Sequence, residues 1–230
     1  MDISDHSRSV ACECAAAIDS VRAVFLIGSA ARHAYNSHTS DVDLLLALGD
    51  DCSLTELKTV IEVLNASTLR IDATLIRNSG LRDIRHPTRV EALVKPNGNV
   101  IWPKEPKRDA LLPIQDAAEC GLWIGGSDPH YKITQVPWDL LRQSIDYVFP
   151  FLRTHFKNPS LSLARAAYTY HHRSMCSKSD AGTWALSEFD PKFHEMIAND
   201  LSSYRVGSRY SCPDEMLRKM ESMISETVRR

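Results

Sequence analysis

Two aspartates stand one residue apart at the end of the stretch GSAARHAYNSHTSDVD (28–43). Asp41 and Asp43 lie at the start of the apolar run 42–48, so both side chains would point to the same face of an extended strand. Like charges this close repel each other unless a cation lies between them. Magnesium prefers carboxylate oxygens together with the phosphate oxygens of a substrate. The pair therefore predicts a site for a metal-bound phosphate.

A third carboxylate lies in a separate apolar run. Asp72 belongs to the stretch LRIDATLI (69–76), which is typical of a buried strand. If this strand lies beside the one that begins near Asp41, the Asp72 carboxylate reaches the same face. Three converging carboxylates can hold two magnesium ions about 4 Å apart, as in many phosphoryl-transfer sites. We therefore predict that Asp41, Asp43 and Asp72 are metal ligands.

The Gly28-Ser29 pair supplies the other half of such a site. It ends the apolar run VRAVFLI (21–27), and glycine lets a phosphate approach the backbone closely. We expect Ser29 to cap a short helix whose first N–H groups face an anion, and its hydroxyl to donate a further hydrogen bond. Gly28, Ser29 and Ser40 are thus the predicted nucleotide-binding residues of this region.

The elements that must position these groups follow from the spacing of apolar residues. Helical and strand-like periods predict two long helices and three strands, over 5–20 and 53–65 and over 21–27, 42–48 and 69–76. Together with the short helix after Gly28 they form a β-α-β-α-β segment, which predicts a mixed sheet with helices on one face. Ser53 followed by Glu56 is typical of a capping box at a helix start.

The rest of the chain is predicted to be helical. Pro103 and Pro106 disfavour a helix near residue 105, where we place the boundary between a first domain (1–105) and a second domain (106–230). Helices are expected over 112–121, 138–155, 160–172, 178–188, 190–204 and 213–228. The predicted fold class is α+β, with an N-terminal mixed sheet followed by an all-helical C-terminal domain.

Composition and charge exclude several classes of protein. The 230 residues carry a net charge of −2, so no basic field favours nucleic acid. No run approaches the ~18 apolar residues of a membrane span. The acidic, polar start is unlike a signal peptide, and the spacing of the six cysteines fits neither a metal knuckle nor a disulfide framework. These features predict a cytoplasmic protein with reduced thiols.

Three segments of the first half carry a resemblance to a known family. FLIGSAAR, SDVDLLL and RIDATLI are similar to the nucleotidyltransferase superfamily that includes DNA polymerase beta, over about residues 20–105. Further along, LSLARAAYTYHHRSMCSKSDAGTWAL (161–186) resembles the C-terminal helical domain of aminoglycoside O-nucleotidyltransferases of the streptomycin/spectinomycin type. This second resemblance implies that Arg165 and Lys178 hold the nucleotide triphosphate.

The combined prediction is an adenylyltransferase that uses ATP and Mg²⁺ to move AMP to a hydroxyl of a small molecule bound between the domains. Asp72 would complete the site and accept the hydroxyl proton. Near the second domain's first helices, Arg153, His155 and Lys157 disfavour a polycationic streptomycin, so the preferred acceptor is a spectinomycin-like aminocyclitol. The alternative is a nucleotidyltransferase-type antitoxin that adenylylates or binds a partner toxin protein.

Overall fold

The computed structural model describes residues 3–37, 40–102, 110–208 and 210–228. Contacts divide the chain into two compact units. Unit 1 comprises Met1–Tyr35 and Ser40–Ser144, and unit 2 comprises Asn36–Thr39 and Ile145–Arg230. Each unit is described by itself below.

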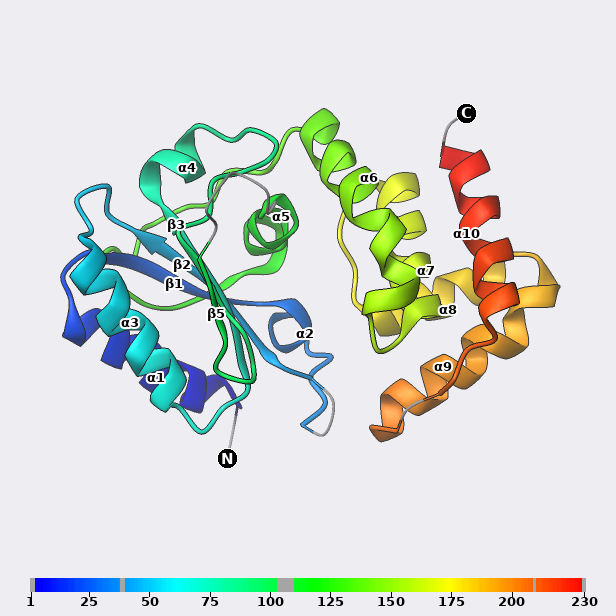
Figure 1. The fold of residues 1–230 in the computed structure, drawn as a ribbon, viewed down its shortest axis with the longest axis horizontal. Coiled ribbons are helices and arrows are strands. Elements are labelled where there is room, and N and C mark those ends of the chain that lie inside the picture. Colours follow the sequence, from blue (N-terminus) through cyan, green and yellow to red (C-terminus); the bar gives the residue numbers. More distant parts are fainter. Residues whose placement is uncertain (1–2, 38–39, 103–109, 209, 229–230) are drawn as a thin grey trace. The chain divides into compact units, whose positions relative to one another are not determined.

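A mixed sheet forms the centre of unit 1 (Figure 1). Within the described residues its order is β5-β4-β3-β2-β1-β6. The strands are β1 (Val21–Ile27), β2 (Val42–Leu48), β3 (Ile71–Arg77), β4 (Ala92–Val94), β5 (Val100–Ile101) and β6 (Leu122–Gly125). Strands β2 and β3 pair in parallel, and the other neighbours pair antiparallel. The three strands predicted from apolar runs are confirmed, and β4, β5 and β6 were not predicted because such short strands show no period.

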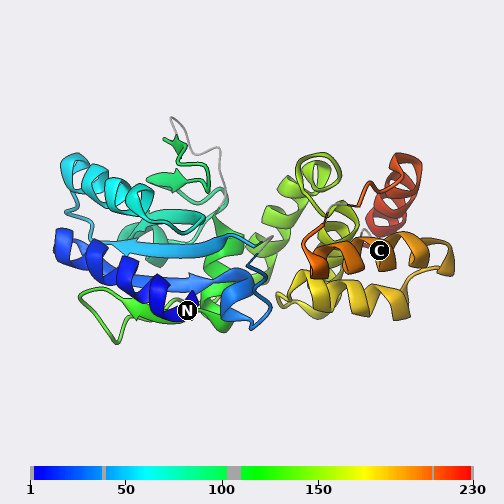
Figure 2. The ribbon, with the colours of Figure 1, turned by 90° about the horizontal axis from the view of Figure 1, so that it is seen from below.

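Five helices of unit 1 are found in the described residues: α1 (Ile3–Ala17), α2 (Gly28–Ala31), α3 (Leu54–Ala66), α4 (Asn78–Arg82) and α5 (Leu111–Cys120). Helices α1 and α3 contact each other and run along one face of the sheet (Figure 2). Helix α5 packs on β1 and β2 from the opposite side (Figure 1). The prediction of helices on one face only was therefore wrong, because α5 had been assigned to the second domain.

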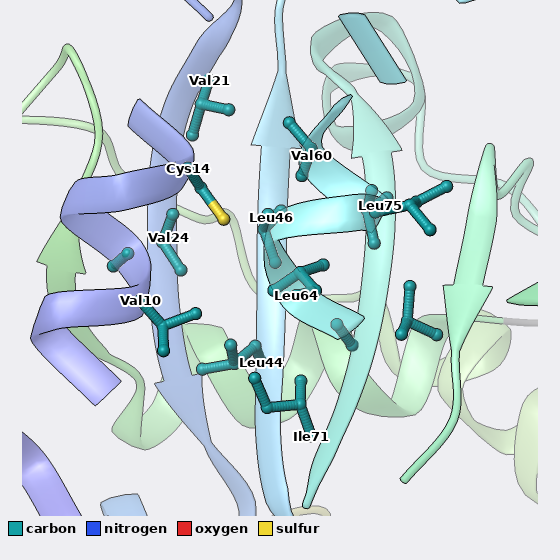
Figure 3. Packing of buried hydrophobic residues seen from close by; sticks show 14 of the residues in the cluster. Val10, Cys14, Val21, Val24, Leu44, Leu46, Val60, Leu64, Ile71 and Leu75 are labelled. Carbon is teal, nitrogen blue, oxygen red and sulfur yellow. The ribbon is translucent and has the colours of Figure 1, made fainter. Parts of the chain in front are cut away.

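The core between α1, α3 and the sheet fixes which way the strands face. Its apolar side chains include Val10 and Cys14 of α1, Val60 and Leu64 of α3, and Val24, Leu44, Leu46, Ile71 and Leu75 of the strands (Figure 3). Burying each large side chain contributes about 1.5–3 kcal/mol. Since neighbouring residues in a strand point to opposite faces, Asp43 and Asp72 must point away from this core.

Helix α3 begins with the predicted capping box. The Ser53 hydroxyl accepts a hydrogen bond from the Glu56 N–H at 3.2 Å, and the Ser53 N–H donates to Glu56 Oε2 at 2.7 Å. The Ser20 hydroxyl donates to Glu56 Oε1 at 2.6 Å. The same carboxylate therefore closes the helix start and ties it to the residue that precedes β1.

Unit 2 is helical throughout its described residues, apart from its connections. Its elements are α6 (Trp138–His155), α7 (Pro159–His172), α8 (Lys178–Glu188), the 3-10 turn η1 (Pro191–Phe193), α9 (His194–Val206) and α10 (Asp214–Val228), and α6 begins within unit 1. Helix α7 packs against α8, α9 and α10. Among the described residues, no helix combines the length and the apolar composition that a membrane span requires.

The division into units comes later in the chain than the predicted boundary near residue 105, which itself lies outside the described residues. Strand β6 pairs with β1, and helix α5 packs on β1 and β2. Both elements therefore complete the sheet of unit 1, and the division falls between Ser144 and Ile145.

Candidate active site

Two of the predicted carboxylates face each other across neighbouring strands. Asp43 of β2 pairs directly with Asp72 of β3 in the parallel register. The expectation that these strands are neighbours is confirmed. Like charges placed opposite each other in a sheet are destabilising unless a cation compensates them. The sheet therefore builds a local concentration of negative charge at one end of β2 and β3.

Lys95 compensates part of this charge. Its ammonium donates to both oxygens of Asp72, at 2.8 and 2.9 Å from Nζ to Oδ1 and Oδ2. Because Ala73 pairs with Val94, Lys95 follows β4 at the position opposite Asp72. The sequence analysis did not identify Lys95, since the register of the short strand β4 is not visible in the sequence.

Asp41 stands just before β2, beside an arginine. Arg70 precedes β3, and its guanidinium Nη2 lies 2.6 Å from Asp41 Oδ1. This distance makes an ion pair, but Oδ1 is buried and has no partner in hydrogen-bond geometry. The Arg70 guanidinium therefore compensates the charge of Asp41 without satisfying Oδ1 as a hydrogen-bond acceptor.

The described residues contain no group of three or more His, Cys, Asp or Glu side chains gathered closely enough to hold a metal ion. The strand register brings Asp43 and Asp72 together, and Asp41 lies two residues before Asp43. The full ligand set of three carboxylates therefore stays a prediction.

Gly28 is packed directly against one of the carboxylates. It follows β1, whose last residue Ile27 pairs with Asp43. A Cβ at residue 28 would lie 2.1 Å from Asp43 Oδ2, and the backbone φ of +67° is one that side chains rarely adopt. Both the backbone and the Asp43 side chain therefore favour glycine at this position.

The expected role of Ser29 as a helix cap was wrong. Helix α2 already begins at Gly28, and its N-cap, Ile27, makes no side-chain capping bond. Ser29 is the second residue of this short helix, and its carbonyl accepts from the Ala34 N–H at 2.8 Å. The N-cap is therefore two residues earlier than predicted. Ser29 remains half-buried and Ser40 is buried.

The first N–H of the turn already has an anionic partner. Asp116 of α5 accepts from the Gly28 N–H at 2.6 Å through Oδ2, and from Arg32 through Oδ1. Burial lowers the pKa of Arg32, but the charge of Asp116 and its hydrogen bond outweigh this effect and leave that pKa raised. The sequence analysis missed Asp116, although an acid within an apolar helix signals a buried partner.

The two predicted phosphate-binding cations belong to unit 2. Arg165 lies on α7 and Lys178 is the first residue of α8, and these helices pack against each other. Both residues are half-buried. The Lys178 ammonium lies 5.8 Å from the centre of the Phe156 ring, and Ser177 caps α8 just before it. Their contact with a triphosphate stays a prediction.

Known proteins resemble this chain in part of its sequence and in its fold. The family described as "Aminoglycoside adenylyltransferase, C-terminal domain" matches residues 133–229. Among solved structures, the chain is similar to spectinomycin adenyltransferase AAD(9) from Enterococcus faecialis with ATP and spectinomycin, with a TM-score of 0.78, 16% identity and 98% of each chain covered. No curated protein matches the chain.

One match is in sequence over part of the chain, and the other is in fold over nearly all of it. The family match identifies the C-terminal domain from sequence, and the structural match extends the likeness in fold to nearly the whole chain. Together they confirm the predicted α+β fold and the predicted resemblance. Over residues 133–229 the chain is therefore similar to the C-terminal domain of aminoglycoside adenylyltransferases, and nearly the whole chain shares the α+β fold of AAD(9).

Proposed function

We propose that this protein transfers AMP from ATP to a hydroxyl group of a small molecule, with Mg²⁺ bound at Asp41, Asp43 and Asp72. The observation that carries the proposal is the pairing of Asp43 with Asp72 across β2 and β3, beside a turn that only glycine fits. Like-charged neighbours at this position are destabilising unless a cation compensates them.

The donor set suits magnesium. Asp43 and Asp72 offer hard carboxylate oxygens from neighbouring strands, and the buried Oδ1 of Asp41 lacks a hydrogen-bond donor. Such oxygens, together with substrate phosphates, are the ligands that Mg²⁺ prefers. Bound magnesium supplies positive charge that offsets both the carboxylates and the triphosphate. We propose two ions, with Lys95 and Arg70 providing the remaining local positive charge.

The protein groups then position the reactants. The acceptor oxygen forms a bond to the α-phosphorus while the bond from that phosphorus to the leaving pyrophosphate breaks. In the proposed site Asp72 accepts the hydroxyl proton, and Lys95 orients its carboxylate. Arg165 and Lys178 bind the triphosphate, Arg through two parallel hydrogen bonds and Lys as a point charge. Catalysis of this kind rests mainly on positioning and charge.

The acceptor class is proposed from the comparisons and from local charge. The solved relative is described with spectinomycin, an aminocyclitol. In unit 2, Arg153 is paired with Asp214 and Glu221. Its charge is therefore compensated, and it excludes a cationic acceptor less strongly than the sequence suggested. We propose an aminocyclitol or aminoglycoside hydroxyl as the acceptor, with spectinomycin as the first compound to test.

The acceptor is identified by incubating the protein with α-labelled ATP and Mg²⁺, together with a panel of aminocyclitols and aminoglycosides. In a parallel incubation, proteins co-purified from the producing cells replace the small-molecule panel. The proposal predicts that label moves to a small molecule and that pyrophosphate is released in equal amount. Label confined to a protein would contradict it and favour the antitoxin alternative. Release of pyrophosphate without any acceptor would contradict both.

A further inference from the structure

Asp116 links helix α5 to the turn that touches Asp43. Its Oδ2 accepts from the Gly28 N–H at 2.6 Å. Its Oδ1 accepts from Arg32 Nε at 3.0 Å and from Arg32 Nη2 at 2.5 Å. One carboxylate thus holds both ends of the short helix α2, which begins at Gly28 and ends just before Arg32.

The environment makes these bonds strong. Asp116 is only 7% exposed, and the side chain of Arg32 is only 16% exposed. Removing one partner from a buried ion pair is costly because the other charge is left uncompensated. Charge-assisted hydrogen bonds to a carboxylate are also short and directional, so they restrict the position of the donor.

Two further side chains of α5 lie next to the pair. Glu119 Oε2 lies 3.5 Å from Arg32 Nη2 and adds a second negative charge. Burial, and next the charge of Asp116, raise the pKa of the Cys120 thiol to about 11. Cys120 is therefore a neutral thiol near pH 7 and does not compete with Asp116 for the guanidinium.

The position of the turn matters because Gly28 forms the wall beside Asp43. A Cβ on Gly28 would lie 2.1 Å from Asp43 Oδ2, so the backbone at residue 28 already contacts the carboxylate closely. A shift of the turn by a fraction of an ångström therefore moves the surface against which the carboxylate rests. We infer that Asp116 and Arg32 are positioning residues that set the Gly28-Ser29 turn, and through it Asp43, for nucleotide binding, an inference that rests on the proposed function.

The main test compares Asp116→Asn with the wild-type protein. Asparagine keeps the shape of the side chain but loses the charge that holds Arg32 and Gly28 together. The dissociation constant of a fluorescent ATP analogue in the presence of Mn²⁺ should rise roughly 10–100-fold, the usual cost of removing a group that orients a metal ligand. Arg32→Lys keeps the charge but loses the paired Nε and Nη2 donors, so its dissociation constant should rise less. This variant replaces Asp116→Asn in the test if Asp116→Asn does not fold.

The control is Glu221→Gln, which removes a half-buried carboxylate from Arg153 in unit 2, where Arg153 Nε lies 3.1 Å from Glu221 Oε2. Thermal unfolding shows whether the variants lose comparable stability. Hydrogen exchange over residues 24–35 reports on the turn directly, and the Gly28 N–H should exchange faster in Asp116→Asn only. A steady-state assay adds kcat and KM for ATP.

The outcomes separate the inference from the proposed function. Weaker analogue binding and faster exchange in Asp116→Asn, at a stability loss like that of Glu221→Gln, would support the inference. Wild-type affinity, kcat and exchange in Asp116→Asn would overturn it, and so would lowered stability with unchanged affinity and exchange. If the wild-type protein binds no nucleotide, the proposed function fails, and the exchange comparison still decides whether Asp116 holds the turn.

Discussion

Gly28 combines two constraints that act on the same atom. Its φ of +67° disfavours any other residue, and the Asp43 carboxylate occupies the space where a side chain would begin. Gly98 provides a useful comparison, because its φ is +78° but the nearest atom to an added Cβ lies 3.9 Å away. The first glycine is therefore constrained by backbone and by space, and the second by backbone alone.

We predict that Gly28→Ala loses more stability than Gly98→Ala and also loses activity. Gly98→Ala should lower the free energy of unfolding by about 1–2 kcal/mol, the cost of a left-handed backbone with a Cβ, and Gly28→Ala should lower it further because its Cβ meets the Asp43 side chain. Gly28→Ala should also lower kcat for AMP transfer about 100-fold, because it displaces the Asp43 carboxylate. Urea unfolding and steady-state kinetics measure both quantities, and a Gly28→Ala protein with wild-type kcat would refute the steric argument.

At the scale of elements, the pairing of three strands sets the charge distribution. Asp43, Asp72 and Lys95 form a row across β2, β3 and the end of β4 because of the register of these strands. A slip of one residue in either pairing would turn a side chain to the opposite face. The row therefore depends on the turn after β4, where the Lys95 N–H donates to the Asn99 carbonyl at 2.9 Å.

Replacing Lys95 by Met should expose the repulsion between the two aspartates. We expect the free energy of unfolding to fall by about 0.2–1 kcal/mol, since like charges would then face each other with less compensation and solvent screens part of the effect. Added MgCl₂ should recover more stability in Lys95→Met than in the wild-type protein. Lys58→Met, at an exposed position on α3, is the control, and an equal response to MgCl₂ in all three proteins would contradict a metal site here.

Glu56 links helix α3 to the start of β1 and makes the stability of this region depend on pH. The hydrogen bond from Ser20, and next the one from the Ser53 backbone, lower the pKa of Glu56 from 4.5 to about 2. A carboxylate with a lowered pKa in the folded state contributes stability above its unfolded pKa and loses it as the pH falls toward the folded value.

We therefore predict that Glu56→Ala is less stable than the wild-type protein by a constant amount above about pH 5, and that the difference narrows as the pH falls from 4.5 toward 2. Unfolding by urea at a series of pH values measures this difference. Glu62→Ala, further along the same helix, is the matched control. A difference that grows on acidification would show that Glu56 does not act through these hydrogen bonds.

At the scale of the whole molecule, the two sets of predicted residues belong to different units. The carboxylates and Gly28 belong to unit 1, whereas Arg165 and Lys178 belong to unit 2. Lys192 is the control lysine in unit 2, because its ammonium also lies near an aromatic ring, 5.0 Å from the centre of Phe193. The two lysines differ in that Lys192 is exposed and its ammonium lies 2.9 Å from Asp190 Oδ2, whereas Lys178 is half-buried.

If Lys178 binds the triphosphate, Lys178→Ala should raise KM for ATP by roughly 10–100-fold, which corresponds to losing a hydrogen bond to a charged group. Lys192→Ala should leave KM for ATP near the wild-type value. The comparison uses the intact chain and the same acceptor in each assay. Equal KM values for the two variants would remove Lys178 from the nucleotide site.

Much of this architecture was predictable because long elements leave periodic patterns. The bounds of α6 and α8 and of strands β1 and β2 match the predicted ranges. Strands β4, β5 and β6 were missed because they are too short to show a period. Asp43 and Asp72 were predicted from their apolar surroundings, whereas Lys95 and Asp116 were not, because their roles depend on strand register and helix packing that local sequence does not encode.

The central claim is that the paired aspartates support nucleotidyl transfer, and one measurement tests it most directly. AMP transfer from labelled ATP to spectinomycin should be compared for the wild-type protein, Asp43→Asn and Asp51→Asn, the last being an exposed aspartate that follows β2. The account predicts that Asp43→Asn lowers kcat by at least about 100-fold while Asp51→Asn keeps the wild-type rate. Transfer that persists in Asp43→Asn would contradict the assignment of the site.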